Sequence, residues 1–166
     1  MAGALDLTEP CHLLAKLEHE FQAVAADNSN SYAAINALRD AYHLREWIWH
    51  GRLENDVALQ ATVMNVAGNE DYWNKYVNQQ FPDFSVVREL CNGSKHFMTK
   101  AKIIQGTRWD SANWDASKWD DKGLYVEVGD RFVPVVDLLT RVRDFWRGLC
   151  AQFRSWDNQR GRTKAR

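Results

Sequence analysis

The stretch VVDLLTRVRDFWRGLCAQF, residues 135–153, decides the fold class because its apolar residues return every three or four positions. This spacing matches the turn of an α-helix, and the resulting apolar stripe is wide. A stripe of this width predicts a long helix that buries one side against other helices. Its members are Leu138, Leu139, Val142, Phe145, Trp146, Leu149, Cys150 and Phe153.

Earlier segments offer helices for this long helix to pack against. Apolar residues return at helical spacing after Pro10, where Thr8 is placed to cap a helix and proline suits the first turn. A second helix is predicted from about Tyr32 to His50, with Gly51 placed to end it. Further helices are predicted at about 53–65, at 70–80 after an Asn69 cap, and at 84–98.

The helical period disappears between about 98 and 135. The segments 98–106 and 123–135 are richer in β-branched residues, and Gly129-Asp130 separates two alternating runs as a two-residue hairpin turn would. We therefore predict a mainly α fold, a helical bundle with a small β-hairpin or β excursion inserted before the last long helix. Residues 1–155 would form this single domain, and the basic segment 156–166 would be a flexible tail.

Composition narrows the function classes. The net charge of −1 gives no global attraction to nucleic acid or membrane, and no apolar run is long enough to span a bilayer. The three cysteines are scattered and form no CxxC pair, which favours reduced thiols, a cytoplasmic location and no zinc ribbon. The N-terminus shows no signal-peptide pattern, and no Gly-rich phosphate loop, GxSxG or HExxH is present. We expect no cofactor and no membrane partner.

The stretch VVRELCNGSKHFMTK, residues 86–100, carries the main candidate site. Arg88, Asn92 and His96 are spaced four residues apart, so they form one row beside the apolar side of the predicted helix. A cation, an amide and an imidazole suit binding a phosphate and moving a proton. Gly93 in mid-helix suggests a kink or the close approach of another element. The row is equally what the solvated side of a core helix would look like.

An Arg, a polar residue and a His near one another on a helix of a small helical chain resemble the HEPN superfamily of bacterial toxin and phage-defence systems. The resemblance implies a four-helix-bundle domain, often a metal-independent ribonuclease whose site forms in a homodimer. By that resemblance His96 would move the proton of the attacking 2′-hydroxyl, Arg88 would stabilise the phosphate and Asn92 would orient them. NGSKHF also resembles a motif in uncharacterised bacterial proteins. The alternative is a non-catalytic interaction or dimerisation module.

A second polar stripe, consisting of Arg39, His43, Glu46 and His50, is predicted on the helix at 32–50. His43 and His50 lie two turns apart, about 10 Å along the axis, so we predict no shared metal ion. Pairing along the helix surface explains Glu46. The functional alternative is that this stripe faces the Arg88–His96 row across a groove.

A Trp-Asp dipeptide recurs at intervals of five residues between 107 and 123, at Trp109, Trp114 and Trp119. Five matches neither a helix nor a strand, so the three rings cannot share one regular face. Stacking on the bases of a single strand is disfavoured, because three basic residues stand against four acidic ones. We predict that the rings fold back on the body or bind a partner protein. The chain's predicted partners are thus RNA, a second copy or another protein.

Overall fold

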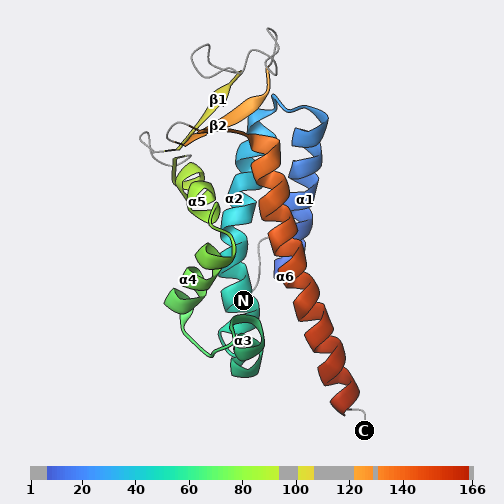
Figure 1. Ribbon diagram of the computed structural model, residues 1–166. Coiled ribbons are helices and arrows are strands. Elements are labelled where there is room, and N and C mark those ends of the chain that lie inside the picture. Colours follow the sequence, from blue (N-terminus) through green and yellow to red (C-terminus); the bar gives the residue numbers. More distant parts are fainter. Residues whose placement is uncertain (1–6, 94–100, 107–121, 129–130, 165–166) are drawn as a thin grey trace.

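The computed structural model describes residues 7–93, 101–106, 122–128 and 131–164. Figure 1 shows a helical body with a small sheet at one end and a long last helix along its side. The prediction of a mainly α bundle with a β excursion before the last long helix is confirmed. The elements are α1 (Pro10–Ala26), α2 (Ser31–Ile48), η1 (Trp49–Leu53), α3 (Val57–Met64), α4 (Glu70–Gln80), α5 (Phe84–Gly93), β1 (Lys102–Gln105), β2 (Leu124–Val128), β3 (Arg131–Pro134) and α6 (Val135–Lys164).

Helix α6 enters the core through the apolar stripe predicted for it. All eight stripe residues are buried except Phe145, which is half-buried and packs against the core. Trp146 is fully buried, its indole N–H donates to the carbonyl of Ala41 on α2 at 2.9 Å, and its ring meets Phe84 of α5 edge-on at 5.8 Å. One residue therefore joins α2, α5 and α6.

Helices α1 and α2 form a closely packed hairpin. Asn30 caps α2 by accepting the Ala33 N–H on its side-chain oxygen at 3.0 Å. Four buried alanines on α2, whose small side chains let the helix axes approach, supply much of the side turned to the core: Ala33, Ala34, Ala37 and Ala41. Because α1, α5 and α6 all pack on α2, this helix is the centre of the bundle.

The N-terminal signals of α1 were predicted only in part. Pro10 begins the helix as predicted, but the N-cap is Glu9, which makes no side-chain cap. The Thr8 hydroxyl lies 3.3 Å from His12 Nδ1, and the Thr8 N–H donates to the same nitrogen. Thr8 therefore packs against the first turn without capping it.

The prediction that Gly51 ends the second helix was wrong. The chain continues beyond α2 through one π-helical turn, η1, which includes Gly51. A Cβ added to Gly51 would lie 3.3 Å from Pro10 Cδ, so the missing side chain allows the first turn of α1 to pack closely here. Glycine has a packing role at this position and does not cap the helix.

The three strands form one antiparallel sheet in the order β1-β2-β3. Pairing of Val128 with Arg131 leaves two residues between β2 and β3, as the predicted hairpin requires, although residues 129–130 themselves lie outside the described part. The sheet is attached to the bundle by the Leu124 N–H, which donates to the backbone carbonyl of Asn28 in the α1–α2 connection at 2.9 Å. Leu124 and Val126 are buried in the common core.

The segment 156–166, predicted to be a flexible tail, is helical as far as Lys164, and Figure 1 shows this end of α6 continuing beyond the other helices. Side chains connect it to the body. Arg52 of η1 donates to both carboxylate oxygens of Asp157 at 2.8 Å and covers the ring of Phe153. Arg160 pairs with Asp56, the cap of α3. These contacts between distant residues leave no periodic signal in the sequence.

Candidate functional site

The row predicted on the 84–98 helix is visible as far as Asn92, and His96 lies outside the described residues. Helix α5 buries Phe84, Val87 and Leu90 on one side. Arg88 is exposed, and Asn92, one turn later, is half-buried. Because the opposite side of α5 is held in the core, the backbone positions of Arg88 and Asn92 are fixed relative to the bundle.

The Arg88 guanidinium is only weakly neutralised. It pairs with the carboxylate of the next residue, Glu89, at 3.9 Å, and 47% of the Arg88 side chain is exposed. This separation is beyond hydrogen-bond range, and exposed pairs of this kind stabilise little. Arg88 therefore retains most of its capacity to bind an anion.

The second predicted stripe does not form a metal site. His43 Nδ1 lies 3.5 Å from Glu46, while His50 Nδ1 lies 3.1 Å from Glu54, so each imidazole faces a different carboxylate. Glu46 also pairs with Arg45 at 3.0 Å. Within the described ranges no group of three or more His, Cys, Asp or Glu side chains could hold a metal ion. Pairing along the helix surface, as predicted for Glu46, accounts for His43, Glu46 and His50.

Arg39 behaves differently from the rest of its stripe. It is exposed, and in the part of the chain that the structure describes no carboxylate pairs with it. It lies on α2, which packs side by side with α5, and the two helices run in opposite directions (Figure 1). The rings of Tyr42 and Phe84 stack across this contact at 6.1 Å.

Helical geometry brings Arg39 and Arg88 to one edge. Starting from the stacked Tyr42–Phe84 pair, Arg39 lies about one turn back along α2 and Arg88 about one turn forward along α5, which in antiparallel helices is the same level. Both lie on the outward side of their helices, because the neighbouring Leu38 and Val87 point into the core. We call Arg39, Arg88 and Asn92 the arginine edge. That the two polar rows face each other across a groove stays a prediction, because His96 lies outside the described residues.

The charges on the other side of α2 are paired. Asp40, 9% exposed, accepts a hydrogen bond from Lys16 of α1 at 2.7 Å. Burial raises the pKa of the Asp40 carboxyl, and this effect exceeds the lowering by Lys16. Burial alone would lower the pKa of the Lys16 ammonium, but the hydrogen bond and charge of Asp40 raise it. This pair joins α1 to α2, and each charge has a partner within the fold.

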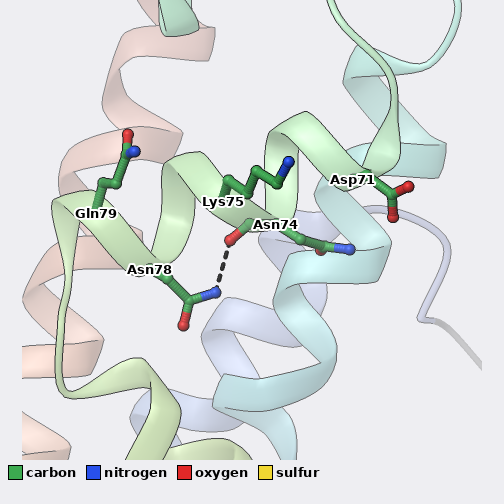
Figure 2. A pocket seen from close by; sticks show the side chains of 5 residues that line it. All are labelled: Asp71, Asn74, Lys75, Asn78 and Gln79. Carbon is green, nitrogen blue, oxygen red and sulfur yellow. Dashed lines mark hydrogen bonds between the residues drawn. The ribbon is translucent and has the colours of Figure 1, made fainter.

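A hollow of about 500 Å³ lies along α4, and none of its lining residues belongs to a predicted site. Figure 2 shows that its five lining side chains all come from that helix: Asp71, Asn74, Lys75, Asn78 and Gln79. Asn78 donates to the backbone carbonyl of Asn74 at 2.7 Å, while the buried Asn74 Oδ1 accepts no hydrogen bond within the described residues. The five lining side chains are all polar or charged, but they include no imidazole, thiol or hydroxyl.

One set of predicted site residues falls wholly outside what the structure describes. Trp109, Trp114 and Trp119 all lie in the segment 107–121, so their role in partner binding stays a prediction. Conversely, the exposure of Tyr32 was not predicted. This residue begins the second predicted helix, and its ring lies on the outward side of α2 with 83% of its surface exposed. The sequence did offer a signal: Tyr32 precedes Arg39 by seven residues, which places both on the same outward side of the helix.

No family model matches the chain, and no curated protein or solved structure matches it significantly. The resemblance to HEPN domains therefore stays a prediction. None of the helices in the described ranges is long and apolar enough to cross a membrane. What the chain binds has to be argued from its own surface, and the arginine edge is the strongest feature there.

Proposed function

We propose that this protein is a HEPN-like RNA-directed protein that binds the RNA backbone through the arginine edge. The proposal is supported by helical geometry, which puts Arg39 and Arg88 at the same level on the outward sides of α2 and α5, with neither held by a close carboxylate in the described ranges. Two like charges at one edge repel each other unless an anion lies between or beside them. A phosphate diester is an anion of suitable size and geometry.

The residue types suit phosphate better than a simple counter-ion. A guanidinium presents parallel N–H donors that match two phosphate oxygens, and an amide such as that of Asn92 adds a neutral donor. With a net charge of −1, the chain has no overall basic field, so binding depends on this local arrangement. Mutation of either Arg39 or Arg88 should therefore greatly weaken RNA binding.

The catalytic form of the proposal adds His96. On a helix continuing from α5, a residue eight positions after Arg88 would return to the same side. In metal-independent RNA cleavage His96 would remove the proton of the 2′-hydroxyl, and Arg88 would stabilise the charge that develops on the phosphate. No cofactor is needed for this chemistry. Such an activity would fit a toxin or phage-defence role.

Binding is tested by fluorescence anisotropy of labelled RNA over a range of salt concentrations. We expect Arg39→Ala and Arg88→Ala each to weaken binding and to reduce the slope of log K against log salt by about 0.7 for each phosphate that the variant no longer neutralises. Arg147→Ala is the matched control, because Glu18 of α1 already pairs with that guanidinium at 3.0 Å. Equal effects of all three substitutions would refute a specific edge.

Catalysis is tested separately, by RNA cleavage in EDTA with wild type, Arg88→Ala and His96→Ala. Loss of cleavage in both variants at unchanged thermal stability is the expected result. Cleavage that survives both substitutions, or an absence of cleavage by a wild type that binds RNA, would leave a binding protein without this catalytic site.

A non-catalytic interaction or dimerisation module is the second candidate. It is favoured by Tyr32 and Ile35, large apolar residues that are exposed on the same helix as Arg39. Exposed apolar groups of this kind often mark protein contacts. Sedimentation analysis of the wild type combined with RNA anisotropy distinguishes the candidates, because only this one expects a complex that forms without any affinity for RNA.

A further inference from the structure

Tyr32 is the most exposed large apolar side chain in the described part of the protein, at 83%. It lies in the first turn of α2, where the next two residues, Ala33 and Ala34, turn into the core and hold the backbone in place. An aromatic ring presented to solvent from a fixed backbone loses little further entropy when a flat partner stacks on it. The position therefore suits recognition of a planar group.

The ring lies in line with the arginine edge. Tyr32 and Arg39 are seven residues apart on α2, which is two turns and about 10.5 Å along the same side of the helix. Ile35 lies between them at the border of exposure. Asn92 of α5, one turn beyond Arg88, is level with this first half of α2. A ring, an apolar residue and Arg39 thus follow one line along α2, and Arg88 of α5 lies at the level of Arg39 beside the end of that line.

Charge along this line favours a polyanion at the Tyr32 end. The residues of α2 from Ser31 to Arg39 include no carboxylate. The next residue, Asp40, points away from this line toward Lys16. The carboxylates of Glu46 and Glu54 follow Arg39 at the other end and are held near basic or imidazole groups. The positive end of the α2 dipole also lies at Tyr32.

We infer that Tyr32 is a stacking platform for an unpaired base, so that the ligand of the arginine edge is single-stranded RNA. This inference rests on the proposed function. The backbone of the strand would follow Arg39 and Arg88 while a base lies on the Tyr32 ring. Single-strand binding sites combine an aromatic platform and a basic track in this way, within a span of a few nucleotides. A duplex cannot bind in this mode, because its base faces are already stacked on each other.

The test compares three RNA probes: a short oligouridylate, the same length of abasic ribose-phosphate chain, and a perfect duplex. Wild type should bind oligouridylate more tightly than either of the others. Tyr32→Ala should weaken oligouridylate binding by roughly 5- to 150-fold and leave abasic binding unchanged, whereas Tyr32→Phe, which keeps the ring, should bind as wild type does. Tyr72→Ala, which removes an exposed tyrosine from α4, is the matched control.

The outcomes separate this inference from the proposed function. If wild type binds no RNA, both fail. If Arg39→Ala and Arg88→Ala weaken binding but Tyr32→Ala does not, the arginine edge stands and the stacking platform is refuted. Equal or tighter binding of the duplex also refutes the platform. If Tyr32→Ala dissociates a dimer without changing RNA affinity, the ring belongs to a protein interface and the inference fails.

Discussion

Two neighbouring charged residues on opposite sides of helix α2 differ in burial and in pairing. Asp40 faces α1, is almost fully buried and is bound by Lys16 at 2.7 Å. Arg39, the preceding residue, faces outward beside α5 with no carboxylate partner in the described ranges. One side uses its charge to hold two helices together, and the other leaves its charge available to a ligand.

This contrast is what distinguishes a structural polar residue from a candidate site. A buried carboxylate without a partner would destabilise the fold by several kcal/mol, so Asp40 requires Lys16. An exposed arginine without a partner costs the fold little, because water solvates it. The inner side of α2 should therefore respond to mutation in stability and the outer side in binding.

The largest expected effect is on the inner side. Trp146→Ala removes a fully buried ring and its hydrogen bond to Ala41, which together join α2, α5 and α6. We expect the free energy of unfolding to fall by about 3–5 kcal/mol. Urea denaturation followed by circular dichroism measures this. A decrease of only about 1 kcal/mol would mean that Trp146 does not connect the three helices as described.

The second-largest effect is expected when the buried charge of Asp40 loses its partner, and it can be compared with the loss of the exposed charge of Arg39. Lys16→Ala leaves the Asp40 carboxylate buried without its donor and should cost on the order of 2–3 kcal/mol. Arg39→Ala should change stability by no more than about 0.5 kcal/mol. The same urea titration serves both variants. The double variant Lys16→Ala, Asp40→Ala should recover part of the stability, and a purely additive result would contradict a coupled pair.

A smaller effect is expected where charges pair without burial. Asp157→Ala removes the ion pair with Arg52 that connects the end of α6 to the body. Because 53% of the Asp157 side chain is exposed, the global free energy of unfolding should change by roughly 0.2–1 kcal/mol. Amide hydrogen exchange should nevertheless become faster in residues 154–164. Unchanged exchange would show that α6 is stable there without this ion pair.

The smallest effect is a dependence on pH, and its sign follows from the raised pKa of Asp40. The folded protein holds this proton more tightly than the unfolded chain does. Its contribution to stability is present below the ordinary aspartate pKa of 3.8 and is lost as pH rises through the folded value. Relative to Asp40→Asn, wild type should therefore lose stability as pH increases from about 3.8 upward. If wild type instead gained stability relative to Asp40→Asn as the pH rises, the pKa of Asp40 would be lowered in the folded protein and not raised.

The pH measurement is specific to Asp40 in this range. The pKa of Lys16 is also raised, so its contribution persists until the pH passes its ordinary value of 10.5. Denaturation between about pH 3 and 7 thus samples the carboxyl alone within the pair. Arg39→Ala, measured in parallel, should show the same pH profile as wild type.

Local periodicity was sufficient to predict the bundle. The stripe of α6, the Asn69 cap of α4 and the hairpin between β2 and β3 depend on contacts within or between adjacent segments, and all are present. The failures had non-local causes. Gly51 accommodates Pro10, which is distant in the sequence, and the end of α6 is held by Arg52 and Asp56.

Helical spacing also predicted the members of the candidate site, but not which of them would be paired. Spacing along one helix placed Arg88 and Asn92 on one row, and spacing along another placed Arg39 on a second stripe. Nothing in the spacing distinguished Arg39 from His43 or Glu46 of the same stripe. The distinction comes from which residues each side chain meets in the folded chain.

The amino-acid sequence by itself determined which sides of the helices are apolar, because the helical repeat is a local property of the chain. Only the tertiary structure decided that Asp40 would be bound by Lys16 and that α2 and α5 would pack together so that Arg39 and Arg88 lie at the same level. The physical reason is that charge pairing depends on distance and burial between segments, which no repeat along one segment encodes.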